Sequence, residues 1–108
     1  MRISYTFRNM ESSDGIKNYA SEKIGKIQKY MRSPLHAEVT FSMERHLHRV
    51  DMNLTGDGNQ YAGHGHSDDM YATIDQVVDK IDRQVRDAKA TQNDRRRHSG
   101  ESLRHPED

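Results

Sequence analysis

The sequence predicts an α+β domain in which two amphipathic helices cover one face of a four-stranded sheet. Three segments alternate polar and apolar residues, as strands with one buried face do, and a hairpin signal after the third indicates a fourth strand. Two longer segments repeat apolar residues every three or four positions, as helices do. The order along the chain is β-α-β-β-β-α. With 108 residues, of which 31% are hydrophobic and none is Trp, there is room for one domain with a thin core.

The first strand and the first helix are predicted at residues 2–9 and 13–31. The apolar face of the strand consists of Ile3, Tyr5 and Phe7. Ser12 or Ser13 is the predicted N-cap of the helix, which ends before Pro34 because the residue preceding a proline disfavours helical geometry. The apolar stripe of the helix consists of Ile16, Tyr19, Ala20, Ile24, Ile27, Tyr30 and Met31.

Three further strands are predicted at residues 36–44, 47–55 and 60–66. The tetrapeptide Gly-Asp-Gly-Asn at 56–59 is a strong hairpin signal, so the last two strands should be antiparallel neighbours. The inward positions of the fourth strand include Gly63 and Gly65, which leave space for a helix to lie close. The first two strands are expected to be parallel across the helix between them, with the other pairs antiparallel and both helices on one face.

The second helix is predicted at residues 68–89, with Ser67 or Asp68 as its cap. Its apolar stripe runs from Met70 to Ala88. Counting about 100° per residue separates two flanks of opposite sign. The acidic flank consists of Asp75, Asp79 and Asp82, and the opposite flank of Lys80, Arg83 and Gln84. The acidic trio is interpreted as a solvated helix face and not as a catalytic carboxylate cluster.

Residues 1–90 are therefore predicted to form the folded domain, and residues 91–108 a disordered polar tail. The tail has one aliphatic residue, Leu103, which is too little apolar surface to order it. Its basic tract, Arg95 to Arg97, suits a solubilising segment and an arm that follows a phosphate backbone equally well.

The amino-acid composition of the chain excludes several classes of protein. No segment is apolar enough for a signal peptide or a membrane span, so no membrane association is expected. The absence of cysteine excludes disulfides and thiolate metal sites, which suits the cytoplasm.

The net charge is zero, but residues 1–50 hold 9 Lys and Arg against 5 Asp and Glu, and residues 51–108 hold 8 against 12. The halves thus carry +4 and −4, which leaves a basic side available for phosphate.

The first candidate binding residues are Lys23 and Lys26. They lie beside Tyr19 and Tyr30 along one edge of the apolar stripe of the first helix. They suit either a solvated face with lysine stems over apolar surface or contact with phosphate. No nucleophile is paired with a base, and neither a glycine-rich phosphate loop nor HExxH is present. We therefore expect no enzyme activity, no cofactor and no small-molecule substrate.

Seven histidines are many for this length, and they include the pairs His46/His48 and His64/His66. Each pair would present two imidazoles on one face of a strand, as a zinc or nickel site requires. The two pairs have opposite parity, however, so they converge only if a bulge intervenes. Solvated or RNA-facing histidines are the preferred interpretation, and no metal site is assigned.

Residues 69–75, DMYATID, followed by VDKIDRQ at 78–84, resemble a motif of the ribosome hibernation factors, also called ribosome-associated inhibitor or sigma-54 modulation proteins. The pattern is DMYxAID followed by K and RQ, with Thr73 here in place of its alanine. The resemblance extends over about residues 1–90, in the β-α-β-β-β-α order and in the first helix, and it indicates the short form of the family.

This resemblance implies a cytoplasmic factor of stress or stationary phase that inhibits translation. Such a factor binds the small ribosomal subunit, through 16S rRNA and ribosomal proteins, in the channel of the messenger and the A- and P-site tRNAs. The rRNA-binding residues that it implies are Lys23, Lys26, Lys29, Lys80, Arg83 and Arg86. The acidic flank of the second helix is expected to face away from the RNA. Two alternatives stay open, a general structured-RNA-binding module similar to the double-stranded-RNA-binding domain and a histidine-based metal-binding protein.

Overall fold

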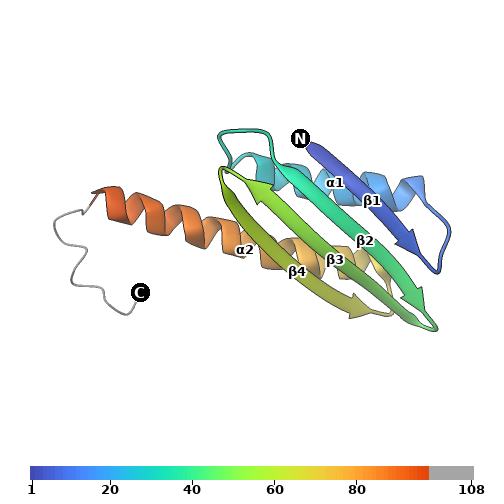
Figure 1. Cartoon of the computed structure of the whole chain (residues 1–108). Helices are drawn as coiled ribbons and strands as arrows, with labels where there is room; N and C mark the ends of the chain where they lie inside the picture. The colour runs from blue at the N-terminus through green and yellow to red at the C-terminus, as the bar shows by residue number, and fades with distance from the viewer. Residues whose placement is uncertain (98–108) are drawn as a thin grey trace.

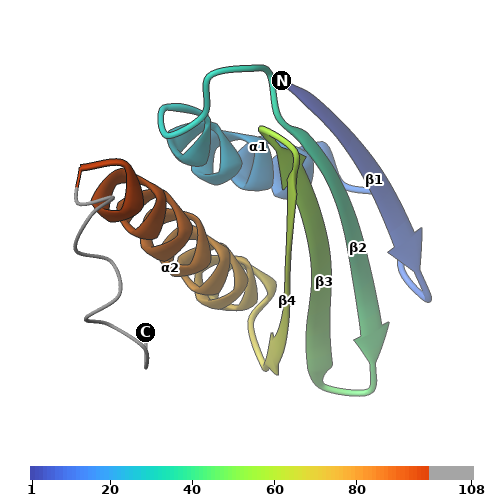
Figure 2. The same cartoon turned by 60° about the vertical axis from the view of Figure 1, so that its left-hand side comes forward.

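The computed structural model describes the backbone of residues 1–97 and the side chains of residues 1–91. The elements follow the predicted order, with β1 at Arg2–Arg8, α1 at Asp14–Gln28, β2 at His36–Glu44, β3 at Leu47–Gly56, β4 at Asn59–Ser67 and α2 at Met70–Arg97. Both helices cover the same face of one four-stranded sheet, and the other face is open (Figures 1 and 2). The predicted fold class is confirmed.

The sheet has the strand order β1-β2-β3-β4, with β1 and β2 parallel and the other two pairs antiparallel, as predicted. Inward-facing residues form rows across it, and one row runs from Tyr5 through Val39 and Met52 to Gly63. This row and the next, from Phe7 to Gly65, begin with an aromatic ring at β1 and end with a glycine at β4. The sheet therefore leaves more room for a helix over β4 than over β1.

Helix α2 uses this room and lies directly against β4. A Cβ atom added at Gly63 would sit 3.4 Å from the Ile81 side chain, and one at Gly65 would sit 3.3 Å from that of Val77. Ile81 and Val77 are fully buried. The expectation that these glycines admit a helix is confirmed.

Helix α1 instead rests on aromatic side chains. The Tyr5 hydroxyl donates a hydrogen bond to the carbonyl oxygen of Lys17 at 3.2 Å, and the rings of Tyr5 and Phe7 both stack on Phe41. The buried face of α1 completes a single core with α2 and the sheet. Its buried residues are Ile16, Ala20, Ile24 and Ile27.

The β3–β4 connection is the two-residue hairpin that the sequence indicates. Asp57 and Gly58 have φ angles of 50° and 84°, so both central residues are left-handed. That geometry belongs to a type I′ turn, whose twist matches the flanking strands. Asp57 is thereby held at one end of the sheet, beside the connection from α1 to β2 and beside Lys89 of α2.

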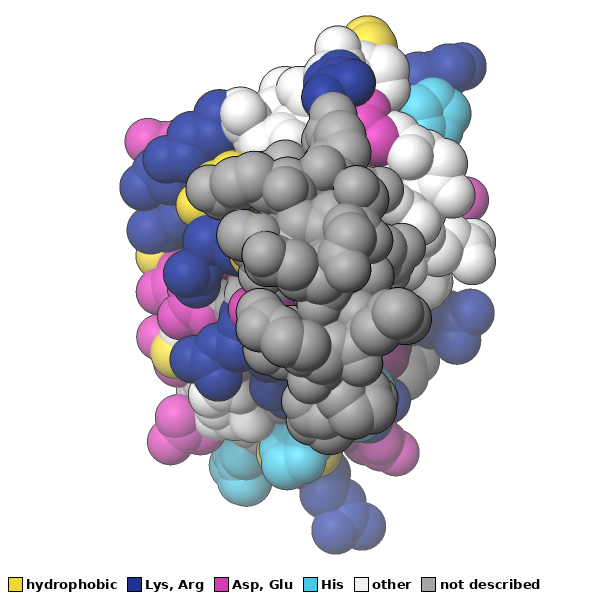
Figure 3. Space-filling view, turned by 90° about the vertical axis from the view of Figure 1, so that its left-hand side faces the viewer, with side chains coloured by type: hydrophobic (Ala, Val, Ile, Leu, Met, Phe, Trp, Pro, Cys, Tyr) yellow, Lys and Arg dark blue, Asp and Glu magenta, His cyan; other side chains and the backbone are white. Residues whose placement is uncertain are grey.

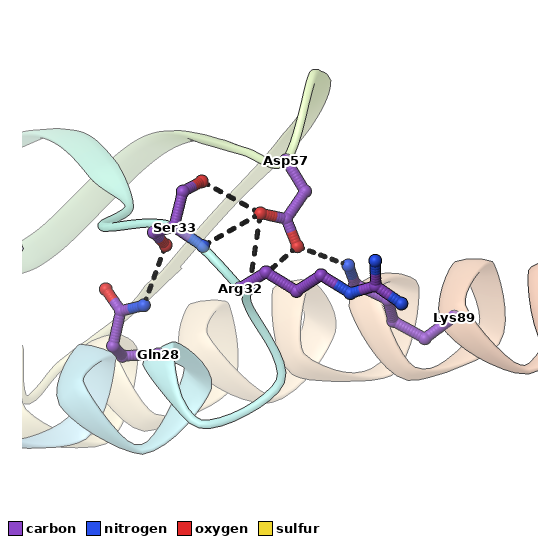
Figure 4. A network of polar contacts seen from close by, with 5 residues as sticks. All are labelled: Gln28, Arg32, Ser33, Asp57 and Lys89. Atoms are coloured by element: carbon purple, nitrogen blue, oxygen red, sulfur yellow. Dashed lines mark hydrogen bonds and ion pairs between the residues drawn. The ribbon is translucent and has the colours of Figure 1, made fainter.

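A polar network fastens these three segments together (Figure 4). The Asp57 carboxylate accepts hydrogen bonds from the backbone amides of Arg32 and Ser33 at 3.0 and 3.1 Å. It also accepts from the Ser33 hydroxyl at 2.8 Å and from the Lys89 ammonium at 2.6 Å. The hydrogen bond from Lys89, with those from Arg32 and Ser33, holds the pKa of Asp57 well below its usual range. The Gln28 amide extends the network by donating to the Ser33 carbonyl oxygen at 2.9 Å.

The helix boundaries differ from the prediction in three places. The Ser13 hydroxyl caps helix α1 at its N-terminus. The helix ends at Gln28, three residues earlier than expected, because the Tyr30 amide donates to the carbonyl oxygen of Ile27, three residues back and not four. The Thr73 amide donates a hydrogen bond to the carbonyl oxygen of Asp69, and the Tyr71 amide donates to the Asp69 side chain. The N-cap of α2 is therefore Asp69 and not Ser67 or Asp68.

The third difference concerns the far end of α2, which continues to Arg97. The helix is therefore eight residues longer at this end than the predicted end at residue 89. Residues 98–108 of the predicted tail lie outside the described residues. The division into a domain and a tail stays a prediction. Within residues 1–97, no helix is long and apolar enough to cross a membrane.

Candidate nucleic-acid interface

Three lysines follow one another at intervals of three residues, two of them in α1 and the third, Lys29, at its C-cap. Lys26 and Lys29 are exposed, and Lys23 is partly buried. The ammonium of Lys23 lies 5.2 Å from the centre of the Tyr19 ring, and that of Lys29 lies 5.6 Å from the centre of the Tyr30 ring. These rings support the lysine stems at the edge of the core. We call Lys23, Lys26 and Lys29 the lysine row.

A groove of about 410 Å³ separates the lysine row from α2. Its α1 wall carries the three lysines, and its α2 wall carries carboxylates. The groove is lined by Lys23, Lys26, Ile27, Lys29, Tyr30, Asp75, Val78, Asp79 and Asp82. On the side of the molecule formed by the helices, at the left of Figure 3, Lys and Arg side chains are interleaved with Asp and Glu.

One end of the groove is closed by a link between the helices. The Tyr19 hydroxyl lies 2.9 and 3.0 Å from the two oxygens of Asp75, and the Lys23 ammonium lies 3.8 Å from the same carboxylate. The hydrogen bond to Asp75 raises the pKa of the Tyr19 hydroxyl above its ordinary value. The Tyr19 ring also packs edge-on against Tyr71, with 5.0 Å between ring centres. Asp75 thus positions Tyr19 and Lys23.

We expected the acidic flank of α2 to face away from the RNA, but in the structure it faces the lysine row. Asp75, Asp79 and Asp82 form the opposite wall of the same groove. The angular count assigned these residues to one flank correctly, but it could not say which flank faces α1. That depends on α1 lying over the β1 side of the sheet.

The basic flank of α2 lies on the opposite side, towards β4, and does not join the lysine row in one continuous edge. The Lys80 ammonium donates to the carbonyl oxygen of His64 at 2.7 Å, and the Gln84 amide donates to that of Ala62 at 2.8 Å. These side chains cover backbone groups on the outer strand of the sheet, which would otherwise attract another strand. Arg83 is exposed, and Arg86 pairs with Asp82 at 3.0 Å.

The histidine pairs remain apart. His46 lies in the β2–β3 turn and His48 in β3, whereas His64 and His66 are exposed on the outer face of β4. In the part of the chain that the structure describes, no group of three or more His, Asp or Glu residues could hold a metal ion.

The family model described as Sigma 54 modulation protein / S30EA ribosomal protein matches residues 3–93. The chain belongs to this family. The match covers every strand and most of α2, and it confirms the family indicated by the DMYATID motif.

Curated relatives and solved structures agree with this assignment. The chain is 25% identical over 92 residues to the ribosome hibernation promoting factor of Pseudomonas putida, which covers 85% of this chain and 90% of the relative. It is 27% identical over 85 residues to the factor of the same name from Escherichia coli, which covers 79% of this chain and 90% of the relative.

Among solved structures, the N-terminal domain of Thermus thermophilus Protein Y superposes with a TM-score of 0.75 at 29% identity. The match covers 79% of this chain and 96% of that domain. A ribosomal subunit interface protein from Coxiella burnetii superposes with a TM-score of 0.73 at 25% identity, over 83% of this chain and 99% of that one. The fold is therefore the fold of these relatives.

Proposed function

We propose that this chain is a ribosome hibernation factor that occupies the messenger and A- and P-site tRNA channel of the small ribosomal subunit under stress or in stationary phase. The observation that carries the proposal is the family match over residues 3–93, whose curated relatives are named ribosome hibernation promoting factors. Binding alone would exclude messenger and tRNA from the channel, so the mechanism requires no catalysed reaction.

The contacts to rRNA are proposed to come mainly from side chains without protein partners. Within the described residues, Lys26, Lys29 and Arg83 are exposed and make no hydrogen bond or ion pair with another side chain. Such cations release counterions when they meet phosphate, which favours binding. Lys23, Lys80 and Arg86 are also proposed contacts. Each of these three already has a protein acceptor, so its contribution should be smaller.

The test reverses the charge of the lysine row at its two exposed positions. The double variant Lys26→Glu, Lys29→Glu should lower affinity for small subunits by about 100-fold or more, because two attractions to phosphate become repulsions. Co-sedimentation through sucrose gradients at moderate salt measures the loss. Lys23 is left intact because its replacement would also disturb Asp75 and Tyr19.

The matched control is Arg2→Glu, Arg8→Glu, which makes the same change of charge on the exposed edge strand β1. This control should bind small subunits nearly as well as the unmodified chain. Equal loss in both double variants would show that overall charge governs binding, and unchanged binding of the lysine variant would refute the proposed surface. Competition by plain duplex RNA would instead indicate a general RNA-binding module.

A further inference from the structure

The two walls of the groove between α1 and α2 have opposite charge, yet they neutralise each other at only one point. Among the described residues that line it, one Lys–Asp pair approaches within 4.0 Å, Lys23 with Asp75 at 3.8 Å. Lys26 and Lys29 stand across the groove from Asp79 and Asp82 without touching them. A ligand between the walls would therefore meet cationic donors on one side and carboxylate acceptors on the other.

The three carboxylates differ in what they already bind. Asp75 accepts from Tyr19, and Asp82 accepts from Arg86 at 3.0 Å. Asp79 is exposed and has no hydrogen-bond or ion-pair partner within residues 1–91. It lies between the other two along α2. Asp79 is thus the acceptor that is available to a ligand.

A nucleotide has the chemistry that both walls require. Its phosphate suits the lysine row, and a neutral base can donate hydrogen bonds to a carboxylate. Guanine places an N1–H and an N2 amino group side by side, which matches the two oxygens of one carboxylate. Uracil offers a single N–H between two carbonyl oxygens that a carboxylate would repel. Tyr30 supplies an aromatic side chain in the lining against which an unpaired base can pack.

The length of the lysine row favours RNA over a free nucleotide. Lys23, Lys26 and Lys29 are three residues apart, so at about 1.5 Å per residue the row extends about 9 Å along α1. That length can follow more than one phosphate of a strand. A mononucleotide would leave part of the row without a partner.

We propose that this groove binds one unpaired guanosine of an RNA strand, with its flanking phosphates on the lysine row and its base edge on Asp79. The choice of RNA rests on the proposed function. In this arrangement the acidic wall gives the groove a preference for one base, whereas the lysines bind any sequence.

The test is an NMR titration of ¹⁵N-labelled full chain with the trinucleotides UGU, UIU and UUU, where I is inosine and lacks only the N2 amino group. UGU should bind at least about fivefold more tightly than UIU or UUU, since one bidentate contact distinguishes them. The shifted amides should belong to residues 23–30 and 75–82. Asp79→Asn should bring the three affinities together, and Lys26→Gln should weaken all three in equal proportion.

Equal binding of the three trinucleotides, or an unchanged preference in Asp79→Asn, would overturn the inference. GMP that binds as tightly as UGU would also overturn it, because the ligand would then be a free nucleotide. Co-sedimentation of the unmodified chain with small subunits separates the two proposals. If the chain co-sediments but shows no guanine preference, only the groove assignment fails. If it does not co-sediment, the ribosomal function itself fails.

Discussion

Helices α1 and α2 carry the same kinds of charged residue, but their lysines have different partners. Lys29, the C-cap of α1, is exposed beside the Tyr30 ring, whereas Lys89 of α2 is three-quarters buried and bonded to Asp57 at 2.6 Å. Lys80 of α2 is likewise bonded to a carbonyl oxygen of β4. The two helices also sit on the sheet differently, α1 on aromatic rings and α2 on glycines.

This difference shows that residue type and helical spacing do not decide what a lysine does. The close approach of α2 to β4 brings its side chains within reach of the strand backbone and of the β3–β4 hairpin. Among the lysines of the lysine row, Lys23 alone has a carboxylate oxygen within 4.0 Å. We infer that α2 mainly holds the domain together and that α1 mainly presents charge to the ribosome.

The largest effect on stability is expected where α2 touches β4. Gly63→Val would insert a branched side chain between the strand and Ile81, which should lower the free energy of unfolding by about 1–3 kcal/mol through overpacking. Ala62→Val, one residue away on the exposed face, is the control and should change stability little. Urea denaturation measures both. Equal effects would show that the glycine is not needed for close packing.

A smaller but pH-dependent effect is expected at Asp57, whose pKa is lowered by Lys89 and by the amides of Arg32 and Ser33. A carboxylate with a lowered folded-state pKa contributes stability above its unfolded pKa of about 3.9, and loses it as the pH falls towards the folded value. Asp57→Asn should therefore lower the melting temperature by several degrees at pH 7 and by much less near pH 2.

The matched variant for this prediction is Asp51→Asn, which removes a carboxylate paired with Arg49 on the exposed face of the sheet. Its effect on melting temperature at pH 7 should be small, because exposed ion pairs contribute little. If the melting temperature of Asp57→Asn fell equally at both pH values, the loss would come from geometry and not from the charged hydrogen bonds.

Much of the fold could be predicted because its signals are local. Alternation located β2 at residues 36–44 as observed, and Gly-Asp-Gly-Asn predicted the hairpin, whose φ angles are those of a type I′ turn. The inward glycines of β4 predicted the close helix. The ends of the helices were less accurate because they depend on contacts outside the helix, such as the side chain of Gln28 bonded to Ser33.

The site was harder to predict because it depends on contacts between distant segments. Asp57 and Lys89 are 32 residues apart, and Tyr19 and Asp75 are 56 apart. No spacing rule connects such residues. The one usable signal was the right-handed β-α-β crossover, which places α1 over the first two strands and so determines which flank of α2 it faces.

The smallest effect is expected for Lys80, the basic residue of α2 that is bonded to His64. Lys80→Met should change small-subunit affinity by about twofold at most, since its ammonium already has a protein acceptor. Lys29→Met, the same change at the C-cap of α1, should lower affinity several-fold. Filter binding with labelled small subunits compares the two directly. If Lys80→Met were the weaker binder, the division of roles between the helices would be reversed.

The most direct measurement of the central claim is the salt dependence of small-subunit binding. If about five phosphates are contacted, log K should fall against log salt with a slope of roughly −3.5 to −4.5 in the unmodified chain. Lys26→Gln, Lys29→Gln should make that slope less steep by roughly 1.4 to 1.8, because two phosphate contacts are lost. Arg2→Gln, Arg8→Gln should leave it unchanged. An unchanged slope in the lysine variant would contradict the claim that α1 binds the rRNA backbone.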